Sequence, residues 1–281
     1  MLKVYRAGDH YAFDFYSVHD MRDYIATMPL GRHYEERSHE ASRARTKFTG
    51  TSSYAAAERL LDYGCPDIAE KLAKTVCKAQ KIELKNSFVR QQAGFVPVVA
   101  SWLCGDPQSM LAVKRQRRQA RVIDAYVCCS YSCNISTDAI IKAQSRALSM
   151  VRGLEESGLR VNLWAFFAVA GSGREFAFYL RLKKAEEKLN ILKLSYPFCH
   201  SSFLRRHFFA LLEHTAAADA ESLSRNYGRP LHDEALLDLV GKTKKIGDNA
   251  IVFPAEVNDR RFYAFLKKQN CEFAEKALTN F

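Results

Sequence analysis

The chain has 281 residues, of which 48% are hydrophobic and 12% aromatic, and its 42 lysines and arginines outnumber its 31 acidic residues to give a net charge of +11. This composition is typical of a globular protein with a sizeable core, arranged as one large or two modest domains. No apolar run approaches the ~20 residues of a membrane-spanning helix, and the N-terminus does not resemble a secretory signal. We therefore expect a cytoplasmic protein with reduced cysteines and no membrane partner.

The excess positive charge is spread along the chain instead of forming a basic tail. Such a charge is typical of proteins that bind nucleic acid. It is equally compatible with a basic soluble protein whose charge only aids solubility. Both interpretations stay open at this point.

Residues 1–112 are predicted to be mostly helical after one or two short strands near the start. One helix is predicted to begin after Ser17, its N-cap. A second helix is predicted to begin after the N-cap Ser52 or Ser53 and to end at Gly64. A third helix is expected over residues 66–82. Residues 31–50 are polar and basic, as in an exposed loop or loosely held helix, whereas residues 95–111 read as an extended connection packed on the body.

Residues 113–281 alternate apolar strands with amphipathic helices, which predicts an α/β domain with a mostly parallel sheet flanked by helices. The strand that begins at Arg174 follows its neighbour after a short GSG turn, so we expect it to be the antiparallel edge of that sheet. The expected strands lie at 121–130, 160–170, 174–182 and 250–256, and the expected helices at 136–158, 186–194, 201–215 and 258–271.

The stretch YVCCSYSCNIS, residues 126–136, joins the first of these strands to the following helix, where open α/β sheets commonly bind ligands. Its cysteines fit zinc poorly, because the adjacent Cys128 and Cys129 should point to opposite faces of the strand. Cys199 and His200, in a later loop, could approach these cysteines as further zinc ligands. No C-x-x-C redox pair is present. We favour Cys128 and Cys129 as small buried hydrophobic residues.

The order of strand, serine-containing loop, long helix and strand resembles the von Willebrand factor A domain, a Rossmann-like fold. The resemblance implies that a metal-ion-dependent adhesion site would occupy this loop, built on the motif Asp-x-Ser-x-Ser. The matching residues are Cys128, Ser130 and Ser132, with a cysteine where the family has its aspartate. Without that carboxylate a hard cation loses its main ligand, so we expect a degenerate site without a metal.

Three segments resemble a family of proteins encoded mainly by bacteriophages. They are FTGTSSYAAAERLLDYGCP, VPVVASWLCGDPQSM and SYPFCHSSFLRRHFFALLE, and the resemblance extends from about Phe48 to Phe265. It implies a phage or prophage origin and a location in the host cytoplasm, and it brings no activity with it.

Several basic segments are candidates for contacts with phosphate. The densest is KRQRRQAR, in which Lys114, Arg115, Arg117, Arg118 and Arg121 are not offset by any acidic residue. A solvated linker would explain the same run. We add Arg205 and Arg206, which precede two phenylalanines, although the aromatic residues there are more typical of a core stripe. Arg43 and Arg45 lie in the basic segment 31–50.

No catalytic motif for a nucleophile, a P-loop or a metalloprotease is present, and GSGR is followed by a strand instead of the helix of a dinucleotide site. We therefore expect no enzyme activity and no cofactor. The leading hypothesis is a phage-encoded accessory protein that binds single-stranded DNA in transcription or replication. The alternative is a protein-interaction module that docks a polymerase or another phage or host protein through the loops around Ser130 to Asn134.

Overall fold

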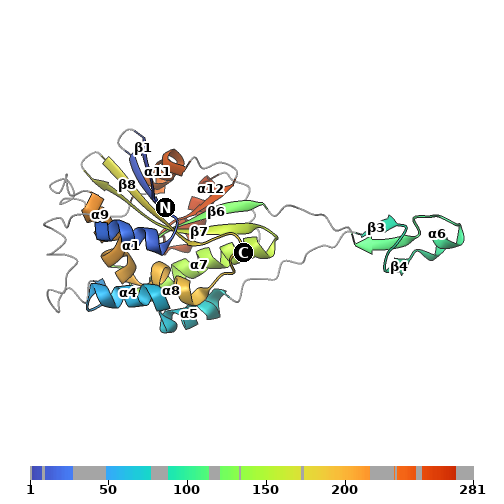
Figure 1. Ribbon diagram of the computed structural model, residues 1–281, viewed down its shortest axis with the longest axis horizontal. Coiled ribbons are helices and arrows are strands. Elements are labelled where there is room, and N and C mark those ends of the chain that lie inside the picture. The colour runs from blue at the N-terminus through green and yellow to red at the C-terminus, as the bar shows by residue number, and fades with distance from the viewer. Residues whose placement is uncertain are drawn as a thin grey trace.

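The computed structural model describes residues 2–7, 10–27, 49–76, 88–113, 121–132, 134–171, 174–215, 231, 233–244 and 249–269. These residues form a main body, in which helices cover both faces of a central sheet, and a small unit that lies apart from it (Figure 1). None of the described helices is both long and apolar enough to cross a membrane.

The central sheet has six strands in the order β1-β2-β8-β7-β6-β9. The pairs β2/β8, β7/β6 and β6/β9 are parallel, whereas β1/β2 and β7/β8 are antiparallel, so the sheet is mixed but mostly parallel. The strands are β1 (Leu2–Ala7), β2 (His10–Phe15), β6 (Val122–Cys128), β7 (Arg160–Gly171), β8 (Arg174–Lys183) and β9 (Ala250–Phe253).

The expected edge position of β8 is wrong. β8 does form the predicted antiparallel hairpin with β7, but its other side pairs with β2 from the start of the chain, where Phe13 lies beside Phe178. Because residues 2–15 supply two strands of the same sheet, the regions 1–112 and 113–281 share one core. The expected division near residue 113 does not separate two packed bodies.

Most of the helices cover one face of the sheet (Figure 1). Serine side chains cap three of them, with Ser17, Ser53 and Ser136 each accepting a hydrogen bond from a backbone N–H in the first turn. The helices of this layer are α1 (Val18–Thr27), α4 (Tyr54–Tyr63), α5 (Pro66–Val76), α7 (Thr137–Glu156), α8 (Ile191–Cys199), the π-helix η1 (Phe203–Phe208) and α9 (Phe209–Thr215).

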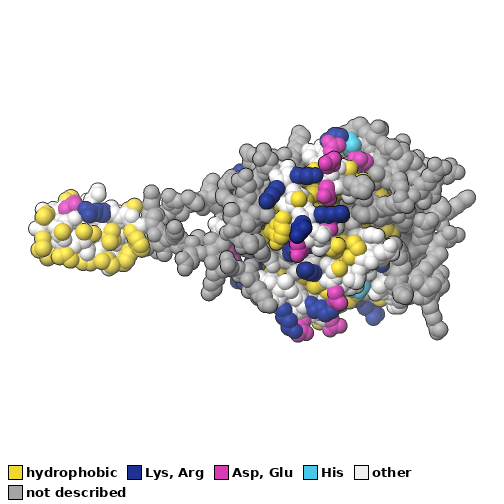
Figure 2. Space-filling view, turned by 180° about the vertical axis from the view of Figure 1, so that it is seen from behind, with side chains coloured by type: hydrophobic (Ala, Val, Ile, Leu, Met, Phe, Trp, Pro, Cys, Tyr) yellow, Lys and Arg dark blue, Asp and Glu magenta, His cyan; other side chains and the backbone are white. Residues whose placement is uncertain are grey.

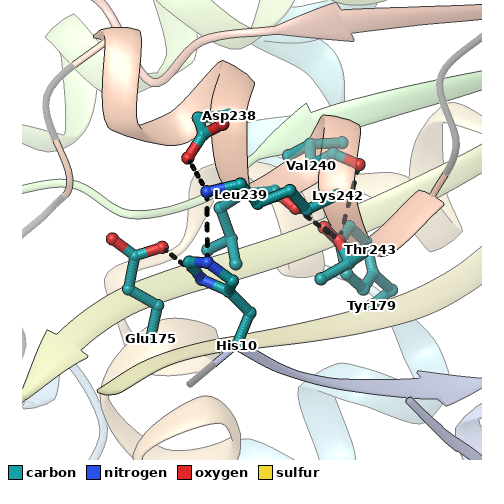
Figure 3. A network of polar contacts seen from close by, with 8 residues as sticks. All are labelled: His10, Glu175, Tyr179, Asp238, Leu239, Val240, Lys242 and Thr243. Carbon is teal, nitrogen blue, oxygen red and sulfur yellow. Dashed lines mark hydrogen bonds and ion pairs between the residues drawn. The ribbon is translucent and has the colours of Figure 1, made fainter. Parts of the chain in front are cut away.

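The opposite face is covered by α11 (Asp233–Lys244), while α12 (Asp259–Lys268) packs at the β9 edge. Polar contacts hold α11 on the sheet (Figure 3). The hydroxyls of Tyr179 and Thr243 lie 2.9 Å apart, and the ammonium group of Lys242 lies between Asp238 and His10. In the described part of this layer, α11 contacts β1, β2 and β8.

Residues 88–113, which we call the aromatic module, form a second sheet with the order β3-β5-β4. The module comprises β3 (Phe88–Gln91), β4 (Val96–Pro97), the short helix α6 (Val99–Leu103) and β5 (Met110–Val113). It stands away from the main body, in contrast to the packed connection expected from the sequence (Figure 1). Only Ser109 is buried between residues 88 and 112, so the module has no core of its own.

Candidate nucleic-acid interface

The two adjacent cysteines where β6 meets the following loop are buried and not accessible to a ligand. Cys128 and Cys129 are 2% and 3% exposed and belong to the cores on opposite sides of the sheet, as the strand alternation predicted. Burial raises the pKa of both thiols, which keeps them protonated and makes them poor metal ligands.

The serines of this loop are not arranged to hold a cation. Ser130 is 2% exposed, and its hydroxyl accepts a hydrogen bond from the backbone N–H of Ala168 at 3.2 Å. Ser132 is half-buried, and the cavity beside Tyr131 measures only about 10 Å³, the space of a single water. Across the described ranges no three His, Cys, Asp or Glu side chains are placed to bind a metal.

Arg205 and Arg206 are not placed to contact phosphate. Both lie in η1, whose six residues are all buried, and they are 8% and 2% exposed. The Arg206 guanidinium donates to the carbonyl oxygen of Thr51 at 2.9 Å and to the hydroxyls of Thr51 and Thr49 at 3.1 and 3.2 Å. Arg206 therefore links η1 to the segment just before α4, and neither arginine belongs to the candidate interface.

Of the basic run 114–121, the structure describes Arg121. Its side chain is exposed at the start of β6, and its Nε donates to Asn249 Oδ1 at 2.7 Å. The other predicted phosphate contacts, Lys114, Arg115, Arg117, Arg118, Arg43 and Arg45, lie outside the described residues.

The aromatic module exposes three large rings. Phe88, Phe95 and Trp102 are 55%, 58% and 64% exposed, and the centroids of the two phenylalanine rings lie 5.7 Å apart. Hydrophobic side chains cover most of the module in the space-filling view, whereas the visible face of the main body mixes charged, polar and apolar groups (Figure 2). The sequence pattern of residues 95–111 predicted a packed connection and did not indicate this exposed surface. The feature of the sequence that could have indicated it is the length of residues 88–113, because 26 residues are too few to bury three large rings in a core of their own.

In the sequence, the densest run of positive charge follows the aromatic module directly. β5 ends at Val113, and the run KRQRRQAR begins at the next residue. On the other side, residues 77–87 contain three lysines and one glutamate. Exposed rings and clustered cations are the two components of a surface that binds single-stranded nucleic acid.

A family model described as a domain of unknown function, DUF7192, matches residues 3–271, and the chain belongs to this family. No curated protein and no solved structure matches it significantly.

Proposed function

We propose that this chain is a non-enzymatic accessory protein that binds single-stranded DNA on the aromatic module and the adjoining basic run 114–121. The observation that carries the proposal is the exposure of Phe88, Phe95 and Trp102 in one small unit that ends one residue before the run. Each base stacked on such a ring contributes about 1–3 kcal/mol, and the contribution depends little on base identity.

Single-stranded DNA suits this surface better than a duplex. Base stacking on protein rings requires free base faces, which are hidden inside a double helix. The module is a three-stranded sheet with one five-residue helix, too short to read a groove in the manner of a recognition helix. Binding should therefore be insensitive to sequence and should weaken steeply with salt.

The fold family and the biological origin that we propose rest on the two resemblances. We propose that β6, the loop to α7, α7 and β7 correspond to the beginning of a von Willebrand A-like domain, supported by the parallel pairing of β6 with both β7 and β9. A bacteriophage origin and a role in phage transcription or replication in the host cytoplasm rest on the second resemblance.

The test is fluorescence anisotropy of labelled single- and double-stranded oligonucleotides across a salt series, with tryptophan emission recorded in parallel. The chain has two tryptophans, and only Trp102 is exposed, since Trp164 is 5% exposed and stacks on Tyr126. We expect bound single strands to quench Trp102. Trp102→Ala should weaken binding about 5- to 100-fold, because one stacking partner is lost.

A matched control is the neighbouring Leu103, an aliphatic side chain of the same helix that is 73% exposed. Leu103→Ala should change the affinity less than about twofold, because leucine offers no ring for stacking. Replacing Arg117 and Arg118 by alanine should reduce the salt slope by about 1.4. Absence of binding at ~50 mM salt contradicts the proposal.

The second candidate is docking of a phage or host protein, such as a polymerase. Of the loop first considered for this role, Ser130 and Tyr131 are buried, whereas Ser132 is half-buried and Asn134 is exposed. The module offers a further docking surface, because Val96, Val99 and Leu103 are 44%, 62% and 73% exposed. Exposed aliphatic side chains are more typical of a protein-binding surface than of a nucleic-acid interface. Equal binding of oligonucleotides by the wild type and by Trp102→Ala would favour this candidate.

A further inference from the structure

A cavity of about 630 Å³ lies toward the amino ends of β6 and β7, on the face that α11 covers. It is far larger than the cavity at the carboxyl end of β6, and its volume falls within the range of small-molecule sites. Four aromatic side chains line it, namely Tyr5, Tyr16, Tyr126 and Trp164. This cavity is separate from the aromatic module.

The ion pair of Lys244 with Asp14 already has its own partners. Both side chains are nearly buried, at 6% and 5% exposure, and the Lys244 ammonium also lies 3.9 Å from the centroid of the Tyr179 ring. These two charges neutralise each other. They shape the cavity without leaving a charge for a ligand.

Arg181, in contrast, has no anionic partner in the described part of the chain. Its guanidinium lies 5.0 Å from the ring centroid of Tyr16 and 5.7 Å from that of Trp164. Its Nε is buried without a hydrogen-bond partner. A guanidinium held by two rings with unused donors is arranged to bind an anion, with phosphate or carboxylate as the best geometric match.

Asp124 provides an acceptor elsewhere in the same cavity. Its Oδ1 accepts hydrogen bonds from Asn162 Nδ2 and Trp164 Nε1, both at 3.0 Å, which fixes the carboxylate. The described residues donate no hydrogen bond to its Oδ2. A fixed carboxylate with a free oxygen recognises an amino group and repels a second anion.

Asp124 and Arg181 belong to strands separated by β7, with Asp124 paired to Asn162 and Arg181 paired to Trp164, so their backbones lie somewhat more than two strand spacings, or ~10 Å, apart. This separation is of the order of that between the base edge and the phosphate of a mononucleotide. We propose that the cavity binds a nucleoside monophosphate whose base carries an exocyclic amino group, with the phosphate on Arg181, the amino group on Asp124 and the base among the rings. The proposal does not depend on DNA binding by the module.

The test is equilibrium dialysis of the full chain with CMP, UMP and cytidine. CMP and UMP differ at one position of the base, where the amino group of cytosine is replaced by an oxygen. We expect CMP to bind about tenfold more tightly than UMP, because Asp124 accepts from the first and repels the second. Cytidine should bind at least tenfold more weakly than CMP, because it lacks the phosphate.

Two variants separate the two contacts. Arg181→Gln should reduce the affinity for CMP to that for cytidine. Arg181→Lys, which keeps the charge, should have an affinity for CMP between those of the wild type and Arg181→Gln. Asp124→Asn retains an acceptor for Trp164 and should bind CMP and UMP equally. A thermal melt of each variant checks its fold, and His19→Gln, a change at an exposed histidine that does not line the cavity, serves as the control that leaves CMP binding unchanged.

A 5′-phosphorylated oligonucleotide ending in cytidine identifies the source of the ligand. Competition with CMP would assign the site to the end of a DNA strand, and absence of competition to the free nucleotide. The proposal is overturned if CMP does not bind at millimolar concentration, if wild-type protein does not distinguish CMP from UMP, or if Arg181→Gln binds CMP as well as wild type. None of these results bears on the module, whose test rests on Trp102, Leu103, Arg117 and Arg118 and not on Arg181 or Asp124.

Discussion

His207 shows how a single buried side chain links stability to pH. Its ring is fully buried in η1, with Nδ1 3.3 Å from both the Tyr54 hydroxyl and Glu58 Oε1. Burial lowers the pKa of His207 to about 3, with the nearby positive charges of Arg22 and Arg206 acting in the same direction. The ring is therefore neutral, and Glu58 forms its ion pair with Arg22, whose Nε lies 2.5 Å away.

We expect the fold to lose about 2 kcal/mol between pH 7 and pH 5 through His207 alone. In this range the unfolded chain protonates the histidine near its ordinary pKa of 6.5, whereas the folded chain does not. Urea unfolding at both pH values measures the loss. His207→Gln should show a pH dependence smaller by this amount, and His19→Gln, a change at an exposed histidine, should keep it. Equal pH dependence of all three proteins would contradict the assignment.

At the scale of elements, the junction between α4 and α5 depends on Gly64. Its φ of +78° lies in the region that favours glycine, and its backbone N–H donates to the carbonyl oxygen of Leu60 at 2.9 Å. An added Cβ would lie 2.1 Å from the carbonyl oxygen of Leu192 in α8. This close approach allows α4 and α5 to pack against α8.

Gly64→Ala should therefore lower the free energy of unfolding by about 2–4 kcal/mol, since it adds backbone strain and a clash. Gly153, inside α7, is the matched control because an added Cβ there meets no atom within 4 Å. Gly153→Ala should stabilise the protein by about 0.5–1 kcal/mol through helix propensity. Chemical denaturation of both variants provides the measurement, and equal effects would refute the packing argument.

Other elements show how far local signals extend. The N-terminal signals predicted where α1, α4 and α7 begin, and Gly64 predicted where α4 ends, because such signals act within a few residues. The helix expected over residues 186–194 is instead α8, Ile191–Cys199, and the expected end of α5 at residue 82 lies outside the described residues. The edge position of β8 was not predictable in the same way. Its partner β2 lies about 165 residues earlier in the chain, and nothing in either strand specifies the other.

At the scale of the whole molecule, the aromatic module is set apart from the body that carries the sheet (Figure 1). Replacing residues 88–113 by a short Gly/Ser linker should leave the melting temperature of the body within a few degrees of the wild type, because no residue of the module belongs to the hydrophobic cores of the body. Binding of single-stranded DNA should be lost, and binding of CMP should persist. Loss of cooperative melting would show that the module is part of the body, and retained DNA affinity would place the interface elsewhere.

The sequence by itself determined the features that depend on neighbouring residues. These include the starts of α1, α4 and α7, the opposite orientation of Cys128 and Cys129, and the absence of a carboxylate in the loop after β6. The tertiary structure decided everything that requires distant segments to meet. It buried Arg205 and Arg206, exposed the rings of the module, and assembled the cavity of Asp124 and Arg181 from several strands and α11. The physical reason is that burial is a property of the packed chain, and one sequence pattern suits a buried contact and a binding surface alike.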